Sequence, residues 1–105
     1  MIAPEDCHSM RDLRKEIDTI DAELVSLLAM RARYIDRAIE LKPVEGVPAR
    51  IPERVAEVLE HVADLSIRAG VDPKLTVPVW TLIIEWSIAR EEEILGPLET
   101  HDDLG

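Results

Sequence analysis

One stripe of positions in the first half of the chain alternates steps of four and three residues, which is typical of the contact face of a coiled-coil helix. Its members are Leu13, Ile17, Ile20, Leu24, Leu27, Arg31, Tyr34, Ala38 and Leu41, so one position is an arginine. Ser9 followed by Asp12 resembles a capping box, and neither Gly nor Pro occurs again before Pro43. The pattern predicts one helix of about 33 residues.

A loop and a second helix are expected next. Residues 43–51 contain two prolines and one glycine, which predicts a loop of about nine residues that is long enough to be a lid. Pro52 suits the first turn of a helix, and Gly70 suits its end. The apolar positions of this helix fit a period of 3.6 residues and are Val55, Val58, Leu59, Val62 and Leu65.

A third helix is expected to start near Thr76, so that Pro78 falls in the first turn, where a missing N–H does no harm. Gly96 and Pro97 end it. Its predicted buried face consists of Leu82, Ile83, Trp86 and Ala89. The chain should therefore comprise an N-terminal extension (1–8), an all-α domain of one long and two shorter helices (9–96) and an acidic disordered tail (97–105).

A first helix of about 33 residues is roughly 50 Å long, which exceeds the diameter of a compact globule of this chain length. The protein has 105 residues, of which 3% are aromatic and 47% hydrophobic, so the core should be made of aliphatic side chains. A single chain cannot cover so long a helix. We expect a homodimer.

The charge balance narrows the class of partner. Twelve Lys and Arg against 22 Asp and Glu give a formal net charge of −10, which argues against nucleic acid. No apolar run is long enough for a membrane span, and the first residues lack a signal-peptide pattern, so we expect a cytoplasmic protein. Cys7 is the only cysteine, and His8, His61 and His101 have no partner at metal-ligand spacing, so no metal is predicted.

Four basic residues stand where a solvated face would not need them, namely Arg14, Arg31, Lys42 and Arg54. A guanidinium in the stripe of a long helix is costly to bury without an anion. Arg31 therefore has either an acidic partner in the protein or a small dianionic ligand. Arg14 lies 17 residues before it, or roughly 25 Å along one helix. Both can bind one ligand only if they come from different, antiparallel subunits.

Lys42 and two polar residues of the third helix complete the candidate site. Lys42 follows Arg31 by about three turns, so it shares the same helix face at the edge of the loop. Ser87 and Glu91 are four residues apart and face the same way. They are either an exposed polar flank or part of the site. Most members of a charged run such as 90–93 are solvated.

These residues together resemble the all-helical chorismate mutases and their relatives, the isochorismate-pyruvate lyases. The similarity extends over roughly residues 4 to 95, in order and spacing. It rests on Pro4-Glu5-Asp6-Cys7, Leu13-Arg14, Ile17-Asp18, Ile20-Asp21, Arg31 with Tyr34, Lys42, Pro52-Glu53-Arg54-Val55 and the run from Ile83 to Ala89. The resemblance implies an intertwined homodimer whose two sites are each completed by the partner's first helix.

The resemblance also implies roles and no cofactor. Arg14 of the partner subunit and Arg31 would hold the substrate carboxylates, with Arg54 nearby and Ser87, Val55 and Ile88 as further binding residues. Lys42 and Glu91 would flank the ether oxygen, where negative charge grows as the C–O bond of chorismate breaks. Glu91 can help only as a protonated donor, and we expect burial to keep it partly neutral. Many relatives have Gln there.

Departures from the family pattern leave the substrate open. Val55 stands where many mutases have an acid and where the lyases do not, whereas Ser87 matches the mutases. The resemblance favours a chorismate mutase, with isochorismate-pyruvate lyase activity as a second or main reaction. A mutase acting on 4-amino-4-deoxychorismate is a further alternative. A helical dimerisation module without catalysis is the alternative from another class, and it would tolerate alanine at Arg31 and Lys42.

Overall fold

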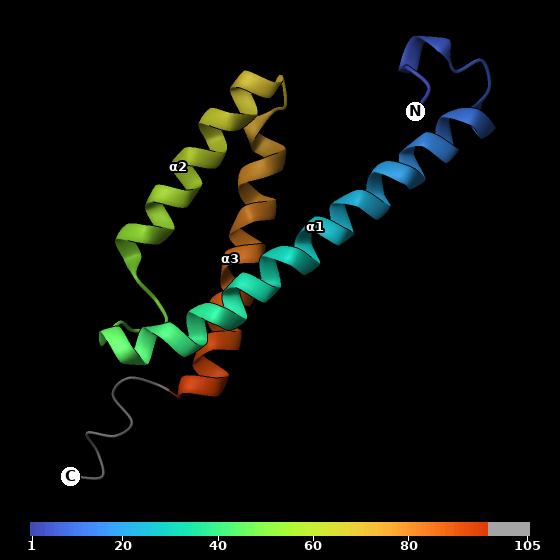
Figure 1. The fold of residues 1–105 in the computed structure, drawn as a ribbon. Helices are drawn as coiled ribbons and strands as arrows, with labels where there is room; N and C mark the ends of the chain where they lie inside the picture. Colours follow the sequence, from blue (N-terminus) through green and yellow to red (C-terminus); the bar gives the residue numbers. More distant parts are fainter. Residues whose placement is uncertain (97–105) are drawn as a thin grey trace. The chain divides into compact units, whose positions relative to one another are not determined.

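The computed structural model describes residues 1–96, and every element in that range is helical (Figure 1). A short 3-10 helix, η1 (Pro4–Asp6), precedes α1 (Met10–Glu45), α2 (Pro52–Ala69) and α3 (Pro73–Leu95). The prediction of an all-α chain with one long and two shorter helices is confirmed. The predicted disordered tail, 97–105, lies outside the described residues.

The two ends of α1 differ in how well the sequence predicts them. Ser9 Oγ accepts the Asp12 N–H at 3.1 Å, as the predicted cap requires. The predicted end before Pro43 is wrong, because α1 runs through Pro43 to Glu45. Proline lacks only its own N–H, and its carbonyl still accepts from Gly46. Gly46, at φ +70°, ends the helix, so the connecting loop spans residues 46–51 and not 43–51.

The boundaries of α2 agree with the prediction, and the start of α3 does not. Pro52 opens α2, and Gly70 closes it at φ +79°, with its N–H directed to the carbonyls of the last turn. α3 begins at Pro73, three residues before the predicted start, because the Asp72 carboxylate caps it by accepting the Lys74 N–H at 2.9 Å. Pro78 consequently lies inside α3.

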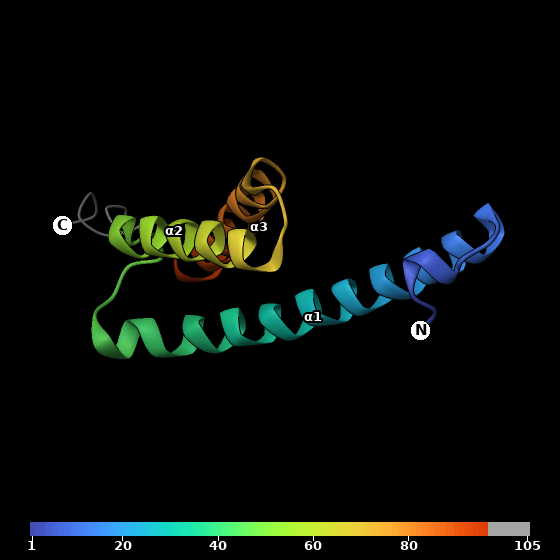
Figure 2. The ribbon, with the colours of Figure 1, turned by 90° about the horizontal axis from the view of Figure 1, so that it is seen from above.

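The chain divides into two compact units, Met1–Tyr34 and Ile35–Gly105. Within the described part of the second unit, α2 and α3 form a helical hairpin and lie side by side (Figures 1 and 2). The buried apolar side chains of this unit are Ile39 of α1, Val62 of α2, and Ile84 and Ile88 of α3. The last turns of α1 therefore share a core with the hairpin.

The predicted buried face of α3 is wrong by about one position. Leu82, Trp86 and Ala89 are exposed, whereas Ile84, Ser87, Ile88 and Glu91 are buried. On α2, Leu65 is likewise exposed and the neighbouring Ser66 is buried. Buried serines are tolerated because each is hydrogen-bonded: Ser66 Oγ donates to the Val62 carbonyl at 2.6 Å, and Ser87 Oγ to the Ile83 carbonyl at 2.9 Å.

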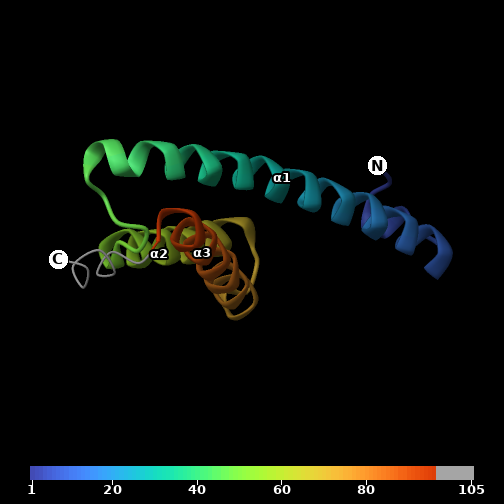
Figure 3. The same ribbon diagram turned by 90° about the horizontal axis from the view of Figure 1, so that it is seen from below.

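Most of the predicted stripe on α1 is exposed in a single chain. Ile17, Ile20, Leu24 and Leu27, in the first unit, are 41–59% exposed. Figure 3 shows α1 as one continuous helix. Within residues 1–96, no helix has the length and hydropathy that a membrane span requires.

An ion pair joins the end of α1 to α3 in the second unit. Arg90 Nε donates to Asp36 Oδ1 at 2.5 Å, and the same guanidinium lies 5.8 Å from the centre of the Trp86 ring. The hydrogen bond from Arg90 lowers the pKa of Asp36 and raises that of Arg90. The contribution of this ion pair to the free energy of unfolding should therefore depend on pH in the acid range, where Asp36 becomes protonated.

Replacing Asp72 with Ala removes the cap of α3 and should lower the free energy of unfolding by about 1 kcal/mol. Asp72→Asn keeps a capping oxygen and is the matched control. Urea denaturation of both variants at one protein concentration is the measurement. Equal stability of the Ala and Asn variants would show that the cap adds nothing.

The Asp36–Arg90 pair predicts a stability difference that depends on pH. Because the hydrogen bond from Arg90 lowers the pKa of Asp36 on folding, the wild type should be more stable than Asp36→Asn above the ordinary pKa of an aspartate, and the difference should disappear as the pH falls through the lowered pKa. Chemical denaturation across this range tests it. Asp64→Asn, at an exposed position of α2, removes the same charge as a control. A difference that persists in acid would contradict the assigned cause.

Candidate functional site

The two residues predicted to be catalytic lie against each other in the second unit. Lys42 Nζ of α1 is 2.5 Å from Glu91 Oε1 of α3, and the two side chains are only 18% and 4% exposed. Burial of opposite charges is tolerated when each is the partner of the other. The interpretation of Glu91 as part of a solvated charged run is therefore wrong.

The ammonium of Lys42 has a second, better aligned partner. Lys42 Nζ donates to the carbonyl of Ala49, in the loop after α1, at 2.8 Å. Glu91 Oε1 is buried and accepts no hydrogen bond among the described residues, so its contact with Lys42 is an ion pair without hydrogen-bond alignment. One orphaned carboxylate oxygen thus faces an ammonium that has N–H groups to spare.

Ser87 and Ile88 lie one turn before Glu91 on the same helix, and both are buried. The interpretation of Ser87 as an exposed polar flank is wrong as well. Its hydroxyl donates along the helix to the Ile83 carbonyl at 2.9 Å. α3 therefore presents Ser87, Ile88 and Glu91 on one interior face.

The loop before α2 contains Arg50, and the first turn of α2 contains Arg54 and Val55, two of the predicted binding residues. Arg50 donates from both terminal nitrogens to the carboxylate of Glu85, at 3.0 and 2.6 Å. Arg54 is exposed and pairs with Glu57 within α2. Val55 is half-buried on the next position. The structure thus gives Arg54 a neighbouring acid that an incoming anion has to replace or share.

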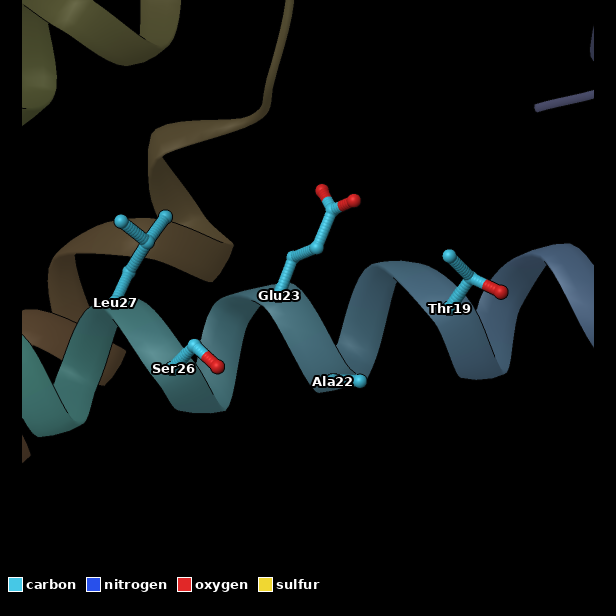
Figure 4. Close-up of a pocket in the computed structure, with 5 residues that line it drawn as sticks. All are labelled: Thr19, Ala22, Glu23, Ser26 and Leu27. Carbon is cyan, nitrogen blue, oxygen red and sulfur yellow. The ribbon is translucent and has the colours of Figure 1, made fainter.

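Arg14 and Arg31 belong to the other unit, on α1. Arg14 is exposed, and Arg31 is partly buried. A shallow hollow on the helix surface between them is lined by Thr19, Ala22, Glu23, Ser26 and Leu27, with Glu23 and Leu27 pointing to the same side (Figure 4). A carboxylate is the one charged group that lines it, so this hollow does not suit a dianion.

Four charged residues of the second unit escaped the sequence analysis: Asp36, Arg50, Glu85 and Arg90. The partners in each pair are 35 or 54 residues apart in sequence. No local spacing connects charges at such separations, whereas i,i+3 and i,i+4 pairs can be predicted from a helix alone. Only the packing of α3 against its neighbours reveals them.

Comparisons with known proteins agree with the resemblance found in the sequence. The family model for chorismate mutase type II matches residues 13–92. An isochorismate pyruvate lyase of Pseudomonas aeruginosa is 37% identical over 92 residues, covering 87% of this chain and 89% of the lyase. A chorismate mutase of Methanocaldococcus jannaschii is 27% identical over 86 residues, covering 82% and 87%.

A longer relative contains the same domain as one part. The bifunctional chorismate mutase/prephenate dehydratase of Aquifex aeolicus is 36% identical over 98 residues, and the match spans 27% of that protein. The family match covers α2 completely and most of α1 and α3, including Lys42 and Glu91. This chain belongs to the chorismate mutase type II family.

Proposed function

We propose that this protein is a chorismate mutase that rearranges chorismate to prephenate without a cofactor or a covalent intermediate. The observation that carries the proposal is the buried Lys42–Glu91 pair, within the segment that matches the family. In this isomerisation the C–O ether bond breaks as a new C–C bond forms, and negative charge grows on the ether oxygen. No proton or group has to leave the substrate.

Lys42 supplies the positive charge that this step needs. Its ammonium is largely shielded from water and is held in place by the Ala49 carbonyl. A fixed charge in a shielded site stabilises a developing anion more strongly than a solvated one, because it does not have to reorient during the reaction. Lys42 remains able to donate to the ether oxygen while it keeps its bond to Ala49.

Glu91 is proposed to be the second group at the ether oxygen. A carboxylate would repel the developing charge, so Glu91 has to act in its protonated form, as a donor. Its Oε1 lies 2.5 Å from Lys42 Nζ, which supports a role for both groups at one substrate atom, Lys42 as an ammonium and Glu91 as a protonated donor.

Substrate binding is proposed to require two chains. Arg14 of the partner subunit and Arg31 hold the carboxylates, with Arg54 near the entrance and with Ser87, Val55 and Ile88 around the ring. The exposed apolar stripe on α1 supports an intertwined homodimer, since burial of these side chains stabilises association. The folded domain is proposed to be 9–96, with 1–8 as an extension.

A shared site predicts complementation between two inactive variants. Arg14→Ala and Arg31→Ala should each lose most activity, and chains mixed by unfolding and refolding together should regain about a quarter of the wild-type activity, because half of the dimers then hold one intact site. The measurement is activity before and after mixing. Light scattering should give about twice 11.8 kDa. A folded monomer, or mixing without recovery, would contradict the shared site.

Glu91 predicts a pH-dependent rate. Because a donor has to carry its proton, kcat should fall toward high pH, and Glu91→Gln, which donates at every pH, should flatten the profile. Initial rates of prephenate formation from pH 4 to 9 are the measurement, with Glu92→Gln, on the exposed side of α3, as the matched control. An unchanged profile in Glu91→Gln would remove Glu91 from the mechanism.

Val55 and one relative support a second activity, the isochorismate-pyruvate lyase reaction. Val55 replaces the acid that many mutases place after the arginine, and the relative from Pseudomonas aeruginosa is an isochorismate pyruvate lyase. An assay with chorismate and, separately, isochorismate should distinguish prephenate from salicylate plus pyruvate. Dominant salicylate would make the lyase reaction the main one. Turnover of neither substrate would favour the 4-amino-4-deoxychorismate or the noncatalytic alternative.

A further inference from the structure

The loop between α1 and α2, residues 46–51, is held at two adjacent positions. The Ala49 carbonyl accepts the hydrogen bond from Lys42 Nζ at 2.8 Å. The next residue, Arg50, binds the Glu85 carboxylate of α3 with both terminal nitrogens, at 3.0 and 2.6 Å. Because the two Cα atoms of neighbouring residues are about 3.8 Å apart, fixing Arg50 limits where the Ala49 carbonyl can point.

Both partners of the Lys42 ammonium are consequently attached to α3. Glu91 belongs to that helix directly, and Ala49 is connected to it through Arg50 and Glu85. Among the described residues, the side chain of Arg50 makes the ion pair that connects this loop to α3. Val47, Pro48 and Ala49 are half-buried, so the loop lies against the protein and not freely in solvent.

The Arg50–Glu85 ion pair is suited to holding the loop against α3 reversibly. Arg50 and Glu85 are 46% and 49% exposed, and an exposed ion pair adds little stability by itself. Its two parallel hydrogen bonds nevertheless fix the orientation of the guanidinium relative to the carboxylate. The hydrogen bond with Arg50 lowers the pKa of Glu85, and Glu92 adds to the negative potential around the guanidinium.

We propose that Arg50 and Glu85 are positioning residues, whose ion pair fastens the loop 46–51 to α3 and thereby aims the Lys42 ammonium through the Ala49 carbonyl. The effect on catalysis rests on the proposed function, in which Lys42 acts at the ether oxygen; the effect on Lys42 itself does not. An ammonium has three N–H groups. With one held by Ala49 and another near Glu91, the third is left in a defined direction for a substrate.

Chemical labelling tests the positioning without any substrate. The chain has three lysines, Lys15, Lys42 and Lys74, and Lys15 and Lys74 are exposed. Arg50→Glu replaces attraction by repulsion from Glu85 and Glu92. It should raise the acetylation rate of Lys42 by acetic anhydride, relative to the other two lysines in the same sample, by about two- to fivefold. Mass spectrometry of the digested protein measures all three.

Charge exchange and a matched control exclude general loosening. The double variant Arg50→Glu with Glu85→Arg should bring the Lys42 labelling rate most of the way back, and incompletely because Glu92 still repels the new carboxylate. Arg37→Glu changes the net charge equally and breaks an exposed pair within α1, so the Lys42 rate should stay at the wild-type value. An unchanged Lys42 rate in Arg50→Glu would overturn the proposal, as would a double variant no slower than the single one.

Kinetics then connect positioning to catalysis. Arg50→Glu should lower kcat by more than it raises KM, since the aim of Lys42 matters most at the developing charge, and the double variant should recover kcat. Faster Lys42 labelling with an unchanged kcat would support the fastening of Lys42 and overturn the proposed role of Lys42 at the ether oxygen. The failures of the two proposals are therefore distinguishable.

Discussion

The burial of two opposite charges, on Lys42 and Glu91, is the constraint on which the second unit of this protein depends. Each group would be costly to bury alone, so α1 and α3 have to place them together. Replacing such a pair by apolar residues is often neutral or stabilising. Stability by itself therefore does not explain why an ion pair occupies this position, and the proposed reaction, which develops negative charge, would use it.

Several other polar and charged side chains of the second unit are paired as well. One buried serine on α2 and one on α3 each donate a hydrogen bond to a backbone carbonyl. The small aliphatic core can therefore contain these polar side chains. Two exposed ion pairs, Asp36–Arg90 and Arg50–Glu85, connect α3 to α1 and to the loop between α1 and α2. With a net charge of −10, attraction of a dianion has to come from local basic groups.

The candidate site residues were proposed from the sequence, and the errors of that sequence analysis about burial and pairing have physical causes. Lys42 and Glu91 were selected by spacing and family resemblance, and the structure brings them together. The interior of α3 was predicted one position off, because a hydrophobic count favours Trp86 over Ser87 when the hydrogen bonds of the serine are unknown. Arg50 and Glu85 were missed since their pairing depends on packing across 35 residues.

The sequence by itself determined the three helices and both ends of α2, since periodicity, caps and glycines act over a few neighbouring residues. It determined as well that Arg14 and Arg31 are too far apart on one helix to share a small ligand. Only the tertiary structure decided which face of α3 is buried and which acids Lys42, Arg50 and Arg90 meet. Those outcomes depend on contacts between distant segments, and local preferences are too weak to fix them.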